Sequence, residues 1–506
     1  MSMLLVTVQS VLGAAGGDSP NSGLVLAEGG ASPHRIVLGR KASPSERHAA
    51  QELRRVLKEI SGARLPIGSD RGVRQGREIL LGDSRHLRAL NLGLDLKSLG
   101  DEGFTIRTAG EDLVIAGGRL RGTMYGVYTL LEDYLGCRWF APGVSHIPRR
   151  DRVVLPPIDD TQVPVLEYRE PFFTCAFDAD WSARNKMNSS AAHLEERHGG
   201  KVTYSHFVHT FFPLLPPEKY FDEHPEYYSL VDGQRKHEHA QLCLTNPEVL
   251  RLVIERVRQW IEEAPAANIY SVSQNDWGGY CQCEKCAALD EQEGSHAGSL
   301  VHFVNQVAEA IEKDHPDKAI DTLAYQYTRK PPKHVVPRPN VIVRLCTIEC
   351  CFAHPLDQCS HEQNRSFVDD IVGWSKLTNR LYVWDYVTNF AHYIMPFPNL
   401  KVLAPNVRFF VDHGVKGIFE EGNYARGGGG EMSELRSYVL AKVLWNPGYD
   451  QENATNEFLE GFFGAAAEPI REYLRLLHAP VEPSEVHVHI YDSPKAAYYS
   501  EHFVKR

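Results

Sequence analysis

The sequence lacks a basic excess, an apolar run of membrane length and a glycine-rich phosphate loop. Its 506 residues carry 65 Asp and Glu against 54 Lys and Arg, a net charge of −11. That balance argues against nucleic acid as a partner, because phosphate recognition usually needs a basic patch or stripe. No apolar run approaches the roughly 20 residues of a membrane-spanning helix. The missing phosphate loop disfavours a doubly wound nucleotide-binding sheet.

The first 22 residues have an apolar stretch around Leu4 to Leu12, followed by small residues and without a basic segment before it. This pattern resembles the end of a secretory signal, and the alternative is an ordinary disordered start. We predict a signal-peptide remnant over 1–22 and a periplasmic, cell-surface or secreted protein. Ten cysteines suit disulfides in such a compartment, but seven of them lie between Cys281 and Cys359, and this clustering also suits a metal.

A small α/β domain is predicted over 23–155. Ser43, Pro44 and Glu46 have the spacing of a capping box before a helix with apolar residues at helical spacing, and Gly62 is placed to end that helix. Strand patterns cover 34–39 and 77–83, a hairpin pattern covers 103–118, and a helix is expected over about 120–134. The Pro-rich stretch 148–164 is predicted to be a linker.

From about residue 165, short β-rich runs alternate with amphipathic helical patterns. Eight candidate strands over about 280 residues predict a (β/α)8 barrel spanning 165–447, with a doubly wound sheet as the alternative fold. The remaining residues, 448–506, predict a helical segment, and we expect a truncated end because no finished element closes the chain. The candidate strands are VLEYRE, VTYSHFVH, QLCLT, NIYSVSQND, IDTLAYQYT, VIVRLCTIE, RLYVWDYV and VKGIFEEGN.

Polar residues at the ends of these strands are the candidate site, because barrel enzymes place their catalytic groups at the carboxyl ends of the strands. Carboxylates, aromatic rings, an Arg and an Asn together suit a sugar ring, whose hydroxyls and apolar face they can bind. The alternative for each carboxylate is a helix cap or an ion pair. The catalytic candidates are Asp276, Asn275, Glu420 and Glu349, and the substrate-contact candidates are Arg169, His209, Tyr325, Tyr327, Trp384, Asp385, Tyr386 and Glu421.

Asp276 is favoured among the carboxylates because it follows a seven-residue run and precedes the aromatic, glycine-containing loop 277–280. Glu420 and Glu421 are rivals, but neighbouring residues on a strand point to opposite faces, so only one of them can face the barrel axis.

Cys281, Cys283 and Cys286 form a C-x-C-x2-C pattern that can hold a structural zinc, enter disulfides or remain as free thiols. A four-ligand zinc site needs one more residue, which we expect from Cys350, Cys351, His354 or Cys359. No cofactor is expected to be required for catalysis.

The segments HPEYYSL, QLCLTNPEV, SQNDWGGYCQCEKC, LAYQYT, PNVIVRLCTIEC, YVWDYVTNFAHYIMPFPNL and VKGIFEEGNY together resemble domain-of-unknown-function family 4838, which includes the glycoside hydrolase family 163 endo-β-N-acetylglucosaminidases. The first 150 residues resemble the α/β domain that precedes the barrels of family 20 hexosaminidases and family 67 α-glucuronidases. The resemblance implies substrate-assisted retention, in which the substrate's acetamide oxygen attacks the anomeric carbon. Family 20 has an Asp-Glu pair where this chain has Asn275-Asp276, and family 85 enzymes are similar in using Asn with an acid.

The sequence therefore predicts a hydrolase of β-linked N-acetylhexosamine in oligosaccharides or glycoprotein glycans, including the chitobiose core of N-glycans. Asp276 is the expected general acid and Asn275 the group that orients the acetamide. The alternatives are an α-glucuronidase-like inverting hydrolase with two separated carboxylates, and a barrel that only binds glycans.

Overall fold

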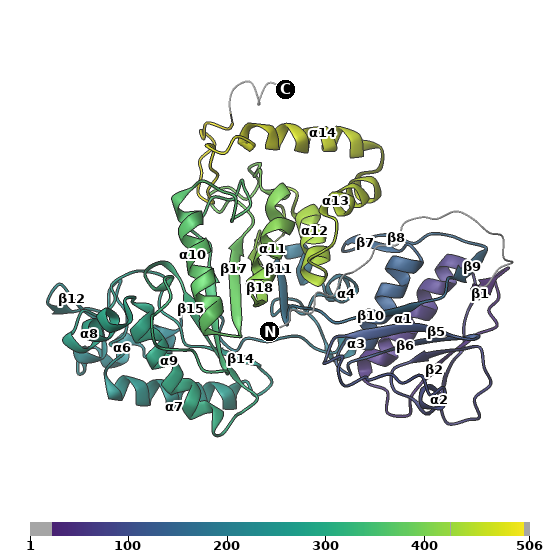
Figure 1. Ribbon diagram of the computed structural model, residues 1–506, viewed down its shortest axis with the longest axis horizontal. Helices are drawn as coiled ribbons and strands as arrows, with labels where there is room; N and C mark the ends of the chain where they lie inside the picture. The colour runs from purple at the N-terminus through teal and green to yellow at the C-terminus, as the bar shows by residue number, and fades with distance from the viewer. Residues whose placement is uncertain (1–22, 426, 500–506) are drawn as a thin grey trace, which may run out of the picture.

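The computed structural model describes residues 23–425 and 427–499 (Figure 1). The predicted signal-peptide remnant over 1–22 lies outside the described residues, so an exported location stays a prediction. Within the described ranges, no helix is both long enough and apolar enough to cross a membrane.

The first domain, on the right of Figure 1, is built on one mixed sheet. Within residues 23–162 this sheet has six strands in the order β10-β5-β6-β4-β2-β3. The predicted capping box is present: Glu46 N–H donates to Ser43 Oγ, and Ser43 N–H donates to the Glu46 carboxylate. Gly62 ends the helix with φ of 78°, a left-handed conformation that its missing Cβ permits.

The elements of this domain are β1 (Leu24–Glu28), β2 (Arg35–Leu38), α1 (Pro44–Ser61), β3 (Ile67–Ser69), β4 (Glu78–Leu81), α2 (Arg85–Ala89), β5 (Phe104–Ala109), β6 (Asp112–Gly117), α3 (Gly122–Thr129), the π-helical turn η1 (Leu130–Tyr134), β7 (Arg138–Ala141), β8 (Val144–His146), β9 (Arg152–Leu155) and β10 (Asp159–Gln162). The predicted hairpin is β5-β6, whose strands pair antiparallel.

The stretch 148–164, predicted to be a linker, instead contributes two strands. β9 pairs antiparallel with β1, and β10 pairs antiparallel with β5. Val153 and Leu155 are fully buried while Arg152 is exposed, so β9 has the period-two pattern of a half-buried strand. Pro156 and Pro157 lie between β9 and β10, and Pro148 and Pro164 lie outside both strands, so none of these prolines removes a hydrogen bond from the sheet.

The second domain is an α/β fold with a curled parallel sheet of the (β/α)8-barrel type. Among the described residues this sheet has six strands in the order β11-β18-β17-β16-β15-β14, which makes it a half-barrel. Two of the eight predicted strands are wrong. The stretch 202–209 contributes only the bridge from Tyr204 to Ile269, and 241–245 contributes only the bridge from Leu242 to Tyr228.

The principal elements of the second domain are β11 (Tyr168–Phe172), α4 (Ala179–Arg184), α5 (Phe211–Leu214), α6 (Pro217–Tyr220), β12 (Leu230–Val231), β13 (Gln234–Arg235), α7 (Pro247–Glu263), β14 (Ile269–Ser271), α8 (Glu284–Glu293), α9 (Ala297–Glu312), β15 (Ala319–Ala324), β16 (Val341–Cys346), α10 (Glu362–Leu377), β17 (Leu381–Tyr386), α11 (Leu403–Asp412), β18 (Val415–Glu421), α12 (Ser433–Trp445), α13 (Gln451–Phe458) and α14 (Ala467–His478).

Buried ion pairs join the two domains. Glu132 of η1 accepts hydrogen bonds from Lys186 Nζ at 2.9 Å and from Lys442 of α12. Arg169 of β11 is fully buried and contacts Glu102 of the first domain at 2.7 Å. We call this buried contact between the two domains the seam. Each buried charge in it has a partner of opposite sign from the other domain, so the two domains depend on each other for their packing.

Candidate active site

The interior face of the sheet is defined by alternating residues of β17 and β18. The Trp384 ring lies 5.4 Å from Phe207 and 5.0 Å from Phe419, with the Arg344 guanidinium near it. Because side chains alternate along a strand, Tyr386 shares this face with Trp384. Phe419 pairs with Trp384 and Glu421 pairs with Tyr386 in the sheet register, so Glu421 also faces the interior.

Glu421 is a carboxyl group in an aromatic environment at the end of β18. The Trp384 indole Nε1–H donates a hydrogen bond to Glu421 Oε2 at 2.8 Å. Burial raises the pKa of Glu421, that hydrogen bond opposes the rise, and the negative charge of Asp276 adds to it, so that the pKa is about 7. A carboxyl group that holds its proton near neutral pH can act as a general acid.

Asp276 lies on the more open side of the same region, with 61% of its side chain exposed. Tyr325 donates its hydroxyl hydrogen to Asp276 Oδ1 at 2.9 Å, and His209 Nε2 is 4.0 Å from the same oxygen. The His209 ring is fixed by a 2.8 Å contact between Nδ1 and the Gln274 carbonyl oxygen. The structure thus brings the predicted residues Asp276, Tyr325, His209, Trp384, Tyr386 and Glu421 into one region.

Tyr491, in the segment after α14, also belongs to this region and was not predicted from the sequence. The Phe390 N–H donates to the Ile490 carbonyl at 2.7 Å, and Asn389 Nδ2 donates to the Asp492 carbonyl at 2.9 Å. Tyr491 is 65% exposed, and its partial burial raises its pKa, with the charges of Glu421 and Asp276 adding to this effect. About 70 residues separate Tyr491 from Glu421, and no strand-end pattern marks it.

Glu420 and Asp385 lie on the opposite face and are 1% and 2% exposed. They pair in the sheet register, and Asp385 Oδ1 accepts a hydrogen bond from Thr347 Oγ1 at 2.6 Å. Burial and then the charge of Asp385 raise the pKa of Glu420 well above its usual value. The structure therefore separates both residues from the Glu421 region, and we move the catalytic candidate on β18 from Glu420 to Glu421.

Two further catalytic candidates are held by structural partners. Asn275 is 3% exposed, and its side chain accepts from the Phe212 N–H at 3.3 Å and donates to the Ala240 carbonyl at 3.1 Å. Glu349 accepts from Arg329 Nη1 at 2.6 Å. These contacts occupy the Asn275 amide and pair one oxygen of the Glu349 carboxylate with an arginine.

Two substrate-contact candidates also lie elsewhere. Arg169 is in the seam between the domains. Tyr327 packs 5.4 Å from the Tyr280 ring and lines a cavity of about 580 Å³ with Cys281, Asp290 and His296.

The three predicted metal-binding cysteines do come together, and their fourth partner is Cys243. All four sulfur atoms lie within 4.8 Å of one another, and the Sγ atoms of Cys243 and Cys283 are 3.7 Å apart. The expectation that the loop after β16 supplies the fourth ligand is wrong. The stretch 238–245 instead crosses the loop after β14, where Gln241 donates to the carbonyl oxygens of Asn275 and Trp277.

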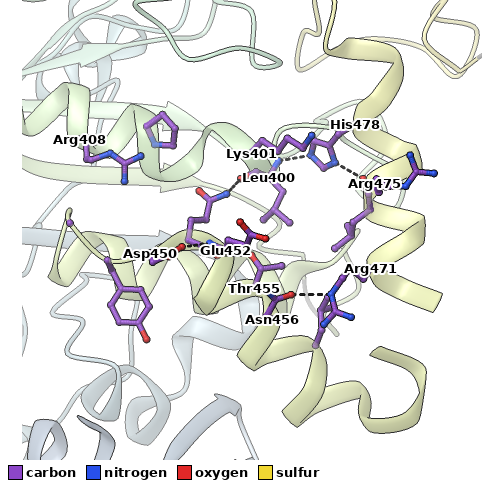
Figure 2. Close-up of a pocket in the computed structure, with 16 residues that line it drawn as sticks. Leu400, Lys401, Arg408, Asp450, Glu452, Thr455, Asn456, Arg471, Arg475 and His478 are labelled. Atoms are coloured by element: carbon purple, nitrogen blue, oxygen red, sulfur yellow. Dashed lines mark hydrogen bonds between the residues drawn. The ribbon is translucent and has the colours of Figure 1, made fainter. Parts of the chain in front are cut away.

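A pocket of about 710 Å³ lies between α11, α13 and α14, apart from the strand ends (Figure 2). Several of its polar groups are paired with one another: the Leu400 N–H donates to His478 Nε2 at 3.1 Å, and Arg471 Nε donates to Asn456 Oδ1 at 3.0 Å. Burial lowers the pKa of His478 to about 4, which keeps the ring neutral. We interpret this pocket as a packing seam between helices.

Residues 139–475, two thirds of the sequence, match the family described as Domain of unknown function (DUF4838). The chain belongs to the DUF4838 family. Residues 27–130 of this DUF4838 protein match the family described as Glycosyl hydrolase family 67 N-terminus. The comparison with curated proteins gave no match in sequence.

Solved structures similar to the DUF4838 protein include BtGH115A, a family GH115 4-O-methyl-α-glucuronidase, with a TM-score of 0.54 and 12% identity over 90% of this chain and 62% of that chain. CpGH84D has a TM-score of 0.52 and 11% identity over 89% of this chain and 71% of that chain. The Flavobacterium johnsoniae chitobiase FjGH20 has a TM-score of 0.49 and 12% identity over 92% of this chain and 72% of that chain. The DUF4838 protein spans less than two thirds of the length of BtGH115A, and at these identities the first two likenesses show a shared fold.

Proposed function

We propose that this DUF4838 protein is a glycoside hydrolase that cleaves β-linked N-acetylhexosamine in glycans, with Glu421 as its general acid. The main observation that supports this proposal is a pair of carboxyl groups at the strand ends that lie in different environments. Glu421 is partly buried beside Trp384 with its pKa raised to about 7, whereas Asp276 is largely exposed and bonded to Tyr325. Two carboxyl groups in different environments suit the division of acid and auxiliary roles in glycoside hydrolysis.

In the proposed reaction, the substrate's acetamide oxygen attacks the anomeric carbon while Glu421 gives its proton to the leaving oxygen. Asp276 accepts the acetamide N–H hydrogen bond, held in place by the Tyr325 hydroxyl. Water then attacks the anomeric carbon and breaks its bond to the acetamide oxygen, while the Glu421 carboxylate takes a proton from that water. This second displacement restores the acid and yields product with retained configuration. Trp384 and Tyr386 offer aromatic faces to the sugar. The sequence motifs favour the chitobiose core of N-glycans as the substrate and endo-action as the mode of cleavage.

A second candidate, an inverting α-glucuronidase-like hydrolase, is favoured by the match of the first domain to a family 67 N-terminus. Such an enzyme needs a cation for the sugar carboxylate. Arg169 and Arg344 are both fully buried, and their guanidinium groups contact Glu102 and Asp321. This geometry supports the hexosaminidase proposal over the glucuronidase one.

The test is to incubate the protein with N-glycopeptides, N-acetylhexosaminides and acidic xylan fragments, and to identify products by mass spectrometry. We expect products cleaved next to N-acetylhexosamine. Release of glucuronic acid alone would replace the proposal with its alternative, and glycan binding without any product would make the protein a binding barrel.

Glu421→Gln and Glu420→Gln form a matched pair of variants for the acid. We expect Glu421→Gln to lower kcat by about 10²- to 10⁴-fold because it removes the proton donor. Glu420→Gln should retain most of the activity, since Glu420 lies on the opposite face. The reverse result would return the acid role to Glu420.

We also propose that Cys243, Cys281, Cys283 and Cys286 hold a structural zinc. The 3.7 Å separation of the Cys243 and Cys283 sulfurs is close to the edge of about 3.8 Å expected for two thiolates in tetrahedral zinc. The Leu230 N–H donates to Cys281 Sγ at 3.4 Å, which suits a thiolate. The site would fix the loop that follows Asp276, and no catalytic step passes through it.

A further inference from the structure

A second cluster of metal-ligating side chains joins the β16–α10 loop to the segment after α14. Cys351, His354 and Cys359 come from the loop, and His487 comes from the distant segment. Their four ligand atoms lie within 4.8 Å of one another. The sequence pattern C-x2-H-x4-C shows the first three residues, but His487 is far along the chain and joins them only through the fold.

The separations match tetrahedral coordination. His354 Nδ1 lies 3.8 Å from Cys351 Sγ and 3.7 Å from Cys359 Sγ, and His487 Nδ1 lies 3.7 Å from Cys359 Sγ. Zinc bonds of about 2.3 Å to sulfur and about 2.0 Å to nitrogen give a sulfur-to-nitrogen edge of about 3.6 Å. We propose that these four residues bind a zinc ion that anchors the C-terminal segment to the barrel.

The His354 ring is oriented as a metal ligand. Its Nε2 lies 2.9 Å from the Val481 carbonyl oxygen. A carbonyl oxygen can accept a hydrogen bond but cannot donate one, so Nε2 carries the hydrogen. Nδ1 is then the bare nitrogen of the neutral ring, and it faces both sulfurs. A backbone carbonyl on the outer nitrogen is the usual way in which proteins fix the tautomer of a metal-binding histidine.

Cys351 is surrounded by donors that favour a thiolate. The backbone N–H groups of Ala353 and Val488 both donate to Cys351 Sγ at 3.4 Å. Hydrogen bonds to the charged form of a ligand stabilise it. One of these donors follows His487 directly, so the segment supplies both a ligand and an outer hydrogen bond.

A disulfide between Cys351 and Cys359 would explain the two sulfurs but not the two imidazole nitrogens that face them. Sulfur and imidazole ligands in a tetrahedral set select zinc among the common metals. Joining the loop to His487 also closes a long stretch of chain, since Cys359 and His487 are 128 residues apart.

The anchored segment leads directly to the candidate active site. Phe352 N–H donates to the Val488 carbonyl at 2.9 Å, and two residues further on the Ile490 carbonyl accepts from Phe390. Tyr491 follows and lies beside Phe390, with ring centroids 6.4 Å apart. If the proposed function holds, the zinc fixes Tyr491 at the rim of the Glu421 region and is structural rather than catalytic.

Metal content tests the site independently of turnover. The protein, purified in the presence of zinc and dialysed, should contain about two zinc ions per chain by inductively coupled plasma mass spectrometry. His487→Gln and Cys359→Ser should each remove about one, and Cys283→Ser should remove the other. His361→Gln is the matched control, since its ring is 4.7 Å from His487 but it is not among the four ligands, and it should keep both ions.

Three further measurements distinguish loss of the zinc site from loss of folding. Circular dichroism should be unchanged in His487→Gln, while limited proteolysis should cut its C-terminal segment faster than that of the native protein. Cobalt replacement should give thiolate charge-transfer absorption that falls in Cys359→Ser. Full zinc content in a folded His487→Gln variant, or a Cys351–Cys359 disulfide in the native protein, would overturn the proposal.

Discussion

At the scale of single residues, the proton on Glu421 is controlled by three neighbouring influences. Burial favours the neutral acid, the Trp384 hydrogen bond favours the carboxylate, and the charge of Asp276 favours the acid again. Because the folded pKa is about 7 against an ordinary 4.5, the folded protein holds a proton that the unfolded chain has released. This residue therefore lowers stability progressively as the pH rises from about 4.5 to about 7.

Trp384→Phe should move the basic limb of the activity profile to higher pH. The change removes the indole N–H that stabilises the Glu421 carboxylate, so the pKa of Glu421 rises and the acid stays protonated further into the alkaline range. The measurement is kcat/KM against pH on a chromogenic N-acetylhexosaminide. Tyr386→Phe alters the same face of β17 without removing this donor and should leave the limb near pH 7. A downward shift in Trp384→Phe would contradict the assignment of Glu421 as the acid.

The sequence predicted Asp276, Tyr325 and Trp384 as members of one site, because strand ends converge in a barrel. It also predicted that only one of Glu420 and Glu421 faces inward, but not which one. That choice depends on the register with β17, where Glu421 pairs with Tyr386. The role predicted for Asn275 depended on its position beside Asp276. Asp276 is exposed, but the Asn275 amide is hydrogen-bonded to backbone groups that come close to it only in the folded protein.

At the scale of elements, the interior of the half-barrel depends on close contact between β17 and β18. Gly417 of β18 pairs with Tyr382 of β17, and the Tyr382 ring stacks on Tyr168 with centroids 5.8 Å apart. A Cβ at position 417 would lie 2.6 Å from the Tyr382 ring. The glycine is thus required by the aromatic side chain that crosses it.

Gly417→Ala should destabilise the protein by about 1–3 kcal/mol, because the Tyr382 ring is fully packed and must shift to admit a methyl group. Chemical denaturation followed by tryptophan fluorescence measures the change. Gly68→Ala, also on a strand but with nothing within 4 Å of the added Cβ, should change stability by less than about 0.5 kcal/mol. Equal stability of the two variants would show that β17 and β18 adjust freely.

Elements with strong local signals were predicted well from the sequence, and those fixed by distant partners were not. The capping box at Ser43 and the β5-β6 hairpin are encoded within a few residues, and both are present. The stretch 241–245 has a strand-like pattern, but it lies across the loop after β14 because Gln241 and Cys243 bind groups in that loop. The apolar composition of this stretch indicates that it is buried, but it does not distinguish a strand in a sheet from a buried loop.

At the scale of the whole molecule, the two domains share a buried charged cluster. Burial alone would raise the pKa of Glu132, but the charges of Lys186 and Lys442 outweigh it and hold the pKa at about 2. Lys186 comes before most of the half-barrel in the sequence, and Lys442 lies on α12, which follows the last strand of the half-barrel. The carboxylate of the first domain therefore joins two distant parts of the second.

Glu132→Gln should destabilise the protein by about 3–5 kcal/mol, because it leaves two buried lysines side by side without a counter-charge. Urea unfolding at neutral pH measures the loss. Glu255→Gln removes one side of an exposed pair with Arg251 on α7 and should cost no more than about 1 kcal/mol.

The same cluster predicts how stability depends on acid. A carboxyl whose folded pKa lies below its unfolded value stabilises the protein above the unfolded pKa, and this contribution is lost as the pH falls through the folded one. For Glu132 the window runs from about pH 4.5 down to about pH 2. The native protein should lose stability across it more steeply than Glu132→Gln, which has already lost the contribution. Parallel stability curves for the two proteins over this window would contradict a charged Glu132 in the seam, and would leave the domains joined by their other contacts, among them the ion pairs Arg169–Glu102 and Arg184–Glu52.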